Sequence, residues 1–246
     1  MYSRKYINFE TIPSTNDYLM AHASLFQEDM VVAVANFQTH GKGQGTHSWE
    51  SEAGKNLLYS ILIHPTEIPI THQFALSMAG ALSIKAVLDR YTGSIMLKWP
   101  NDIYWKDKKI SGTLIETKVD SRGIKNCVFG IGLNVNQQQF VSDAPNPVSL
   151  YQIIGKEINR ENLLHELIDS FEKYVQQLLS SEEDIAHYYH EALYRRNELH
   201  LYRDKQGTFK ATLTSVMPNG HLQLLDLQGH IRIYAFKEVD FIIAEE

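Results

Sequence analysis

Hydrophobic and polar positions along the chain predict strands and helices that follow one another from residue 5 to residue 194. Weak alternation before Pro13 predicts a strand at 5–11, and apolar runs predict strands at 30–36, 56–63 and 124–136. Apolar residues at helical spacing predict helices at 70–90, 160–179 and 183–194. Strands and helices are therefore interspersed, which indicates a domain built from a sheet and the helices that cover it.

From Glu198 onwards the pattern changes to short alternating runs. These runs lie at 200–203, 208–216, 221–227 and 230–236. The turns between them contain Gly207, Gly220 and Gly229, the residue type that tight hairpins favour. Four or five strands within about fifty residues predict a small β-barrel domain, with its boundary at 194–198.

The stretch from Lys98 to Glu116 reads KWPNDIYWKDKKISGTLIE and combines extended runs with many polar side chains. It predicts a strand, a break at Trp99–Pro100 and a β-hairpin that brings Lys98, Asp102 and Lys109 towards one site. Two lysines beside a carboxylate suit chemistry on an anionic, phosphate-like species. The competing interpretation is a strand end with an exposed charged tip, which is common in ordinary hairpins.

Composition narrows the class of protein. The net charge of −6 over 246 residues argues against a nucleic-acid binder with a broad basic face. The single cysteine, Cys127, excludes an internal disulfide and fits a reducing cytoplasm; its apolar surroundings predict a buried thiol. No apolar run predicts a signal peptide or a membrane span, and no histidine pair has a convincing zinc spacing. We expect a cytoplasmic protein without a fixed metal site.

Two segments before the hairpin are suited to holding a polar ligand. Ser14, with Asp17 three residues later, predicts a helix N-terminus whose free N–H groups could bind such a ligand, although a simple cap is the commoner outcome. The loop 38–49 carries glycines at 41, 43 and 45 and a charge at Lys42, so its backbone can approach an anion. It is neither a Walker A loop nor a dinucleotide fingerprint. Gly130 and Gly132, inside a predicted strand, indicate that a ligand or another segment comes close.

Six motifs in order resemble those of the biotin–protein ligase family. They are STN at 14–16, a Gln-led glycine loop ending in Trp49, LLYSI, KWPNDIYW, KISGTLIE and GIGLNVN. The most discriminating part is a pair of motifs: KWPND, and a Lys-Ile-x-Gly sequence that begins seven residues after the Asp of KWPND. The resemblance covers 14–136 by motif. It implies an α+β fold: a catalytic domain over 1–195 with a mixed β-sheet backed by helices, then a small SH3-like β-barrel over 196–246.

The resemblance also implies an activity. Members of the family join biotin to ATP as biotinyl-5′-AMP, releasing pyrophosphate, and transfer the biotinyl group to a lysine of a biotin carboxyl carrier domain. ATP, biotin and Mg²⁺ are then the expected small molecules, with Mg²⁺ arriving with ATP. Both steps build charge on phosphate or carbonyl oxygens, which cations and backbone donors stabilise.

Site residues carried over from the family fall into three groups. The catalytic group is Lys109, Asp102 and Lys98. The biotin-binding group is Ser14, Thr15, Asn16, Gln38, Lys42, Gly43, Gln44, Lys109 and Gly112. The ATP- or adenylate-binding group is Gly41, Lys42, Gly43, Gln44, Gly45, Trp49, Asn101, Asp102, Lys109 and Asn134.

The glycine loop departs from the family pattern GRGRxGRxW. Lys42 keeps a charge, but Gln44, Thr46 and His47 replace Arg, Gly and Arg. A lysine cannot reproduce a bidentate guanidinium contact, and Gln44 carries no charge. We hypothesise that the electrostatic attraction between this loop and the adenylate is weaker than in an Arg-rich loop. Backbone N–H groups would then make a larger share of the contacts that retain the adenylate.

Other interpretations stay open beside the ligase. A lipoate ligase or octanoyl transferase of the same fold is the nearest. The transferase uses a catalytic Cys–Lys pair, whereas the single cysteine here, Cys127, lies in a strand-like run, and the RRxxGGG-type loop of lipoate ligases is absent. A non-catalytic biotin sensor is the second, and the retained Lys109 and Asp102 argue against it. The C-terminal barrel is either a stabilising appendage or a clamp for ATP or the carrier.

Because the first motif begins at Ser14, leaving no room for a winged helix-turn-helix, we expect a ligase without DNA-binding repressor function. The expected partner is the carboxyl carrier domain, with no nucleic acid and no membrane. Whether the protein is a monomer or a homodimer is open.

Overall fold

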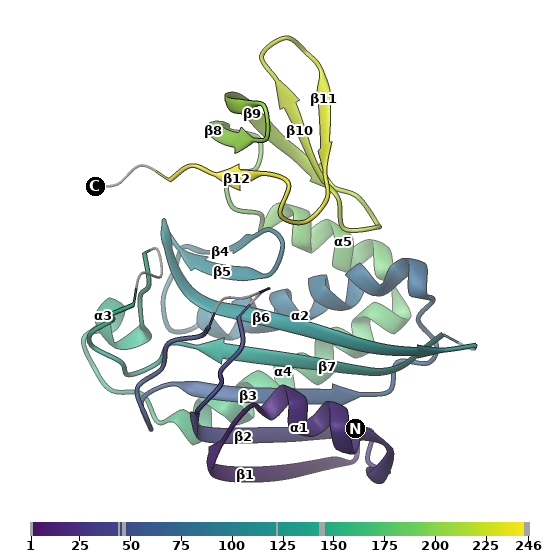
Figure 1. Ribbon diagram of the computed structural model, residues 1–246, viewed down its shortest axis with the longest axis vertical. Coiled ribbons are helices and arrows are strands. Elements are labelled where there is room, and N and C mark those ends of the chain that lie inside the picture. The colour runs from purple at the N-terminus through teal and green to yellow at the C-terminus, as the bar shows by residue number, and fades with distance from the viewer. Residues whose placement is uncertain (1, 44, 46–47, 122, 143–145, 244–246) are drawn as a thin grey trace.

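Two β-sheets make up the protein, with helices packed on the larger one (Figure 1). The computed structural model describes residues 2–43, 45, 48–121, 123–142 and 146–243. The larger sheet has seven strands in the order β1-β2-β3-β7-β6-β5-β4. These strands are β1 (Arg4–Ile12), β2 (Met30–Gln38), β3 (Leu57–Ile63), β4 (Ile95–Lys98), β5 (Asp102–Trp105), β6 (Lys108–Asp120) and β7 (Gly123–Leu133).

Helices cover both faces of this sheet, but unequally. The helical elements are α1 (Thr15–His22), η1 (Ala23–Leu25), η2 (Ile70–His72), α2 (Gln73–Leu88), α3 (Leu150–Ile154), α4 (Arg160–Ser180) and α5 (Glu182–Glu191), where η1 and η2 are single 3₁₀ turns. The long helices α2 and α4 lie behind the sheet in Figure 1, and the short α1 lies in front of it. The front face beyond α1 is therefore left without a covering helix.

The unequal cover explains the sequence pattern of the central strands. On β2, Val32 belongs to the large core shared with α2 and α4, whereas the next residue, Ala33, belongs to a small cluster with Leu19 of α1. All seven residues of β3 are buried. Strands buried on both faces read as continuous apolar runs rather than alternating ones, as predicted here. Cys127 lies in the large core, and burial raises the pKa of its thiol.

The mixed character of the sheet comes from its first two strands. β1 pairs parallel with β2, and every other pair in the sheet is antiparallel. A parallel pair needs a crossover connection, and α1 provides it. Ser14 caps this helix by accepting a hydrogen bond from the Asp17 N–H at 3.3 Å, which confirms the predicted start of the helix.

Several predicted boundaries differ from the structure. The helix predicted at 70–90 is a 3₁₀ turn followed by α2, which ends at Leu88. The helix predicted at 183–194 ends at Glu191, where the chain turns to pair with β4. The helix α3 was not predicted, because five residues are too few to show a period; a capping box at Ser149 starts it.

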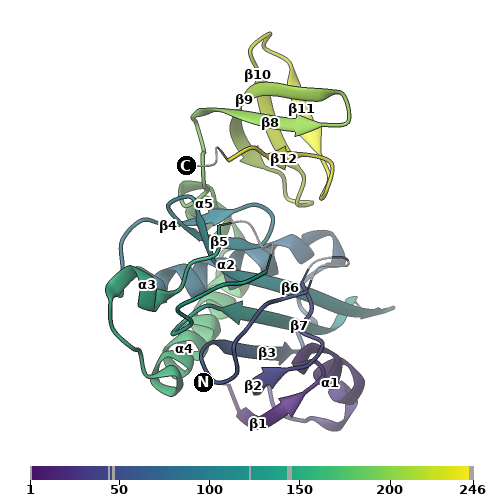
Figure 2. The same ribbon diagram turned by 60° about the vertical axis from the view of Figure 1, so that its left-hand side comes forward.

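The C-terminal sheet contains five antiparallel strands in the order β11-β10-β9-β8-β12. They are β8 (Leu199–Asp204), β9 (Gly207–Val216), β10 (Leu222–Asp226), β11 (Ile231–Tyr234) and β12 (Asp240–Phe241). This arrangement fits the expected SH3-like domain, and Figure 2 shows it standing above the larger sheet. The division of the chain at 195/196 remains a prediction.

Specific contacts attach the C-terminal sheet to the rest of the protein. The Trp99 indole N–H donates to the carbonyl of Gly220 at 2.9 Å, and its ring lies edge-on to Phe236. Leu97 of β4 pairs with Leu193 of the connecting segment. The hairpin β4–β5 is thus held on one side by the sheet and on the other by the C-terminal part. Among the described helices, none is long and apolar enough to cross a membrane.

Candidate active site

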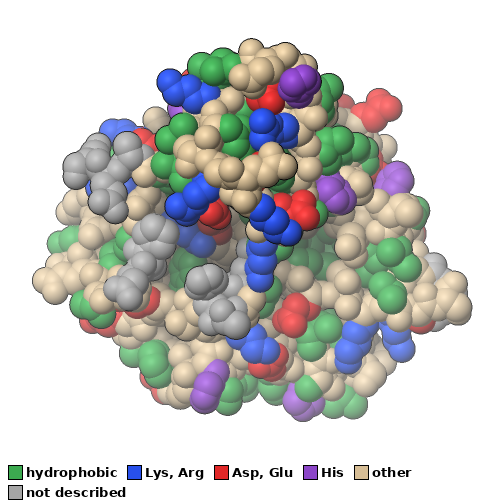
Figure 3. Space-filling view, turned by 45° about the horizontal axis from the view of Figure 1, so that its top comes forward, with side chains coloured by type: hydrophobic (Ala, Val, Ile, Leu, Met, Phe, Trp, Pro, Cys, Tyr) green, Lys and Arg blue, Asp and Glu red, His purple; other side chains and the backbone are tan. Residues whose placement is uncertain are grey.

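A pocket of about 820 Å³ lies on the uncovered front face of the larger sheet and extends to the C-terminal sheet. Figure 3 shows the hollow, with Lys and Arg side chains around it. Most predicted site residues line it: Ser14, Thr15, Asn16, Gln38, Lys42, Gly43, Trp49, Lys98, Asn101, Asp102, Lys109, Gly112 and Asn134. Gly41 and Gly45 lie in the adjoining loop and are not part of the lining. Gln44, Thr46 and His47 lie outside the described residues.

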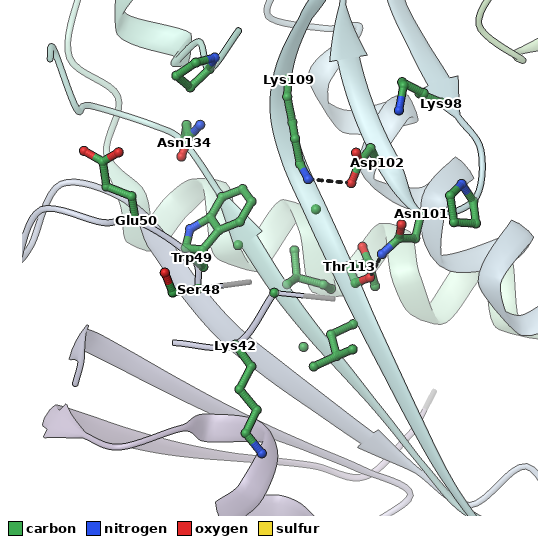
Figure 4. Close-up of a pocket in the computed structure, with 18 of the residues that line it drawn as sticks. Lys42, Ser48, Trp49, Glu50, Lys98, Asn101, Asp102, Lys109, Thr113 and Asn134 are labelled. Atoms are coloured by element: carbon green, nitrogen blue, oxygen red, sulfur yellow. Dashed lines mark hydrogen bonds and ion pairs between the residues drawn. The ribbon is translucent and has the colours of Figure 1, made fainter. Parts of the chain in front are cut away.

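Lys109 and Asp102 meet at the centre of the pocket (Figure 4). Lys109 Nζ lies 2.7 Å from Asp102 Oδ1, and both side chains are mostly shielded from solvent, with 29% and 16% exposed. Two backbone hydrogen bonds hold Lys109 in place. Its N–H donates to the Asn146 carbonyl at 2.8 Å, and its carbonyl accepts from the Val148 N–H at 2.9 Å. The pair presents an ammonium and a carboxylate at fixed positions.

A register shift in the hairpin puts the catalytic candidates on one face. Asp102 pairs with Gly112, but Tyr104 pairs with Lys109, so Ile110 is an extra residue in β6. In a regular strand residues 109 and 112 would point to opposite faces. Here a Cβ on Gly112 would lie 3.2 Å from Lys109 Cε, so the two share the pocket face.

Lys98 reaches the same face from β4, where it pairs with Asp102. Its Nζ lies 5.2 Å from the ring centre of Tyr104 and 5.0 Å from that of Phe241, a residue of the C-terminal sheet. Burial lowers the pKa of Lys98; the negative charge of Asp102 opposes this shift and the positive charge of Lys109 adds to it. The predicted meeting of Lys98, Asp102 and Lys109 is confirmed as geometry.

A buried polar network lies at the α1 end of the pocket. Gln38 Oε1 accepts from the Thr15 N–H at 2.7 Å and from its hydroxyl at 3.0 Å. The Thr15 hydroxyl lies 2.7 Å from Ser60 Oγ, which donates to Asn16 Oδ1 at 2.6 Å. Asn16 Nδ2 in turn donates to Glu116 Oε2 at 2.8 Å. This chain of donors and acceptors can recognise a compact polar group.

Two members of this network, Ser60 and Glu116, were not predicted. Ser60 is fully buried and is the one polar residue in the apolar strand β3. A lone hydroxyl within an apolar run was a signal that the sequence contained, because a buried hydroxyl needs a partner. Glu116 carried no comparable signal, because charged residues are common at the far end of a hairpin strand.

Glycines form the floor of the pocket and admit two bulky side chains. A Cβ on Gly130 would lie 2.2 Å from Asn16 Oδ1, and one on Gly132 would lie 2.4 Å from Cε2 of Trp49. The predicted close approach at these strand glycines is therefore confirmed, and side chains of this chain make it. The Trp49 indole N–H is buried and has no hydrogen-bond partner among the described residues.

The two asparagines predicted to contact the nucleotide differ in their hydrogen bonding. Asn101 donates its amide to the carbonyl of Thr113, so it ties β6 to the turn before β5 (Figure 4). Asn134 donates its amide to the Val148 carbonyl at 3.1 Å, but its Oδ1 is buried without a partner among the described residues. Such an oxygen can accept a hydrogen bond from a ligand.

Lys42 lines the pocket, but its charge is engaged elsewhere. Its Nζ lies 2.5 Å from Asp17 Oδ1 on α1, and in Figure 4 the side chain points away from Lys109. The hydrogen bond to Asp17 raises the pKa of Lys42. The base of the loop is closed by a hydrogen bond from the Trp49 N–H to the Gly41 carbonyl at 3.0 Å.

Within the described part of the chain, no group of three or more His, Cys, Asp or Glu side chains is arranged to hold a metal ion. The polar groups of the pocket are instead the buried network at α1, the Lys109–Asp102 pair and the buried acceptor Asn134 Oδ1. This arrangement suits an elongated ligand with an acidic group in its middle.

The family model described as "Biotin/lipoate A/B protein ligase family" matches residues 8–136, more than half of the chain. The bifunctional ligase/repressor BirA of Bacillus subtilis is 31% identical over 148 residues, which are 58% of this chain and 45% of that protein. The biotin–[acetyl-CoA-carboxylase] ligase of Mycobacterium tuberculosis is 29% identical over 181 residues, covering 70% and 65% of the two chains. The chain thus matches less than half the length of the BirA protein.

The biotin protein ligase of Aquifex aeolicus in complex with biotin and ATP superposes with a TM-score of 0.80 at 24% identity, covering 98% of this chain and 99% of that one. The biotin protein ligase of Leishmania major in complex with biotinyl-5-AMP gives a TM-score of 0.65 at 20% identity, covering 94% and 99%. The fold is therefore shared over nearly the whole chain, including the C-terminal sheet.

Proposed function

The chain belongs to the biotin/lipoate A/B protein ligase family, and on that premise we propose that it is an ATP-dependent biotin–protein ligase. It joins biotin to ATP as biotinyl-5′-AMP and then transfers the biotinyl group to a lysine of a biotin carboxyl carrier domain. The observation that carries this proposal is the Lys109–Asp102 pair, 2.7 Å apart, between a buried polar network and Asn134 Oδ1, which has no partner in the described part of the chain.

The polar network at α1 favours biotin over lipoate or octanoate. A ureido ring has two N–H donors and one carbonyl acceptor, and the network offers carboxylate, amide and hydroxyl groups in a buried place. An alkyl chain or a dithiolane ring has neither the N–H donors nor the carbonyl of a ureido ring, so it would gain none of the hydrogen bonds that this network can offer, each worth about 0.5–1.5 kcal/mol. The head group of biotin therefore lies against Thr15, Asn16 and Ser60.

The first half-reaction takes place at Lys109. An oxygen of the biotin carboxylate attacks the α-phosphorus of ATP, and the bond from that phosphorus to the bridging oxygen breaks, releasing pyrophosphate. The ammonium of Lys109 stabilises the charge on the carboxylate and on the phosphate oxygens, while Asp102 holds this ammonium in position. Lys98 adds a second positive charge on the same face.

The second half-reaction forms the amide. The neutral amine of the carrier lysine attacks the carbonyl carbon of the mixed anhydride, the C–O bond to AMP breaks, and the amine gives up a proton to solvent. Asp102 Oδ1 is placed to accept a hydrogen bond from the incoming amine, and Lys109 stabilises the oxyanion. Asn134 Oδ1 would accept a hydrogen bond from the adenine amino group, and Trp49 would pack beside the nucleotide.

ATP enters with Mg²⁺, which neutralises part of the phosphate charge. We expect Mg²⁺ to be held mainly by the nucleotide. The remaining features of the proposal are a carrier domain as partner, no contact with nucleic acid or membrane, and a cytoplasmic location. A monomer and a homodimer are both compatible with it.

Biotin-dependent exchange of labelled pyrophosphate into ATP tests the proposal, run in parallel with lipoate and octanoate. We expect exchange with biotin alone, and a loss of about 10²–10³-fold in Lys109→Ala. Lys108→Ala is the matched control, because Lys108 is exposed at the turn and lies outside the pocket. Exchange with lipoate instead would assign the protein to the other branch of the family. Tight biotin binding without exchange would favour a sensor.

A further inference from the structure

The C-terminal sheet brings a lysine to the glycine loop. Lys237 lies in the turn between β11 and β12 and lines the pocket. A Cβ on Gly45 would lie only 2.5 Å from Lys237 Nζ, so the ammonium is in contact with the loop backbone. This contact joins parts of the chain nearly two hundred residues apart, and no motif of the sequence indicated it.

The turn is built to present this side chain. Lys237 has φ of +70°, a conformation that costs about 1–3 kcal/mol for a residue with a side chain and persists only where its surroundings hold it. Glu238 supports the turn: its carboxylate accepts from the Ala235 N–H at 2.8 Å, and its N–H donates to the Ala235 carbonyl at 3.2 Å. Val239, which follows, is buried and anchors the turn.

The charge of Lys237 is available to a ligand. Among the described residues no carboxylate pairs with it; besides approaching Gly45, its Nζ lies 5.7 Å from the centre of the Phe236 ring. The nearby Asp240 is paired with Arg203 at 3.2 Å. Lys42, the cation that the loop itself contributes, is paired with Asp17. An anion can therefore reach Lys237 without displacing a carboxylate.

The direction of the first half-reaction indicates which anion that is. In an in-line displacement the leaving group departs on the side opposite the attacking oxygen. The biotin head group lies at α1, which packs on β2, β3 and β7. Lys109 belongs to β6, between these strands and β4, the strand that pairs with the segment leading to the C-terminal sheet. Pyrophosphate therefore departs towards the segment 236–241, which carries Lys237.

We propose that Lys237 binds the β- and γ-phosphates of ATP, so that the C-terminal sheet supplies a cation beside a glycine loop in which Gln44 is uncharged and Lys42 is paired with Asp17. This inference rests on the proposed adenylation reaction. It also gives the C-terminal sheet a direct part in binding ATP, beyond that of a stabilising appendage.

The test is Lys237→Gln, with Lys237→Arg as the charge-preserving variant and Lys205→Gln as the matched control. Lys205 is an exposed lysine of the same sheet, outside the pocket. In pyrophosphate exchange at saturating biotin we expect Lys237→Gln to raise the KM for MgATP and for pyrophosphate about tenfold, the effect of losing one charged hydrogen bond. The KM for biotin, and all constants of Lys205→Gln, should stay within about twofold of wild type.

Binding of pre-formed biotinyl-5′-AMP, which lacks the β- and γ-phosphates, identifies the contact. We expect its Kd to be unchanged in Lys237→Gln and the ATP effect to be reversed in Lys237→Arg. A KM for MgATP equal to that of the control, or an equal loss of affinity for biotinyl-5′-AMP, would overturn the proposal. If the wild type shows no exchange, the adenylation reaction itself has failed. Calorimetric binding of magnesium pyrophosphate to wild type and Lys237→Gln then still decides whether Lys237 holds these phosphates.

Discussion

Gly132 lies directly beneath the indole of Trp49, so closely that a Cβ at position 132 would stand 2.4 Å from Cε2 of the ring. The ring can lie on the strand only because Gly132 has no side chain. Trp49 belongs to the loop and Gly132 to β7, so this contact positions the loop over the floor of the pocket.

Gly132→Ala should therefore displace the indole and lower kcat/KM for biotin-dependent exchange by about tenfold or more, as misplaced binding groups do. Gly93→Ala is the control, because a Cβ there would meet no atom within 4 Å. The measurement is kcat/KM from steady-state exchange kinetics of the two variants. Thermal melting compares their stabilities. Equal activity in both variants would show that the position of the indole does not matter.

Asp102→Asn should slow both half-reactions, because an amide cannot hold the Lys109 ammonium by charge. We expect a loss of about 10²-fold in transfer from isolated biotinyl-5′-AMP to the carrier, and a smaller loss in pyrophosphate exchange, since only transfer also needs an acceptor for the amine. Single-turnover measurements separate the two steps. Asp107→Asn, on the same hairpin but outside the pocket, is the comparison. Normal transfer by Asp102→Asn would remove Asp102 from the mechanism.

Ser60→Ala should weaken biotin binding selectively. It removes the hydroxyl between Thr15 and Asn16, and leaving their groups unsatisfied costs about 1–3 kcal/mol. The KM for biotin should rise about tenfold or more, while the KM for MgATP stays near that of wild type. Ser83→Ala is the control for stability, because Ser83 is equally buried and donates to the Gly80 carbonyl far from the pocket. A similar rise in both KM values would contradict a role in recognising the head group.

Lys98 should make stability depend on pH at the alkaline end. Burial lowers its pKa in the folded protein below the ordinary value near 10.5, so between these two values the unfolded chain binds more protons than the native one. Stability from this group therefore rises with pH across that window, as the cost of burying the charge disappears. Relative to Lys98→Met, wild type should gain unfolding free energy as the pH rises towards the ordinary lysine pKa, measured by urea denaturation. A difference that is constant or falls with pH would contradict the lowered pKa.

Gln44→Arg should slow the release of biotinyl-5′-AMP, because a guanidinium can make charged contacts with the phosphate that an amide cannot. The dissociation rate, measured by chase with unlabelled ligand, should fall about tenfold. Gln228→Arg adds the same charge at an exposed turn outside the pocket and should leave the rate unchanged. An unchanged rate in Gln44→Arg would contradict the weaker electrostatic retention that we expect of this loop.

Much of the fold could be predicted because its signals are local. Continuous apolar runs marked β2 and β3, and Ser14 with Asp17 marked the start of α1. The helix α3 could not be predicted, because it depends on a single capping box and on packing against residues distant in sequence. The contact of Trp99 with Gly220 was equally hidden, since it joins two parts of the chain that share no pattern.

By itself, the sequence determined the order of the elements, the family and the candidate catalytic side chains Lys98, Asp102 and Lys109. Only the tertiary structure decided how these side chains meet. The extra residue Ile110 turns Lys109 onto the face of Gly112, and a strict alternation would have separated them. The pairing of Lys42 with Asp17 and the approach of Lys237 to Gly45 likewise depend on elements brought together by folding. Local patterns record which residues a strand or helix contains, whereas the direction of each charge depends on register and on contacts between distant segments.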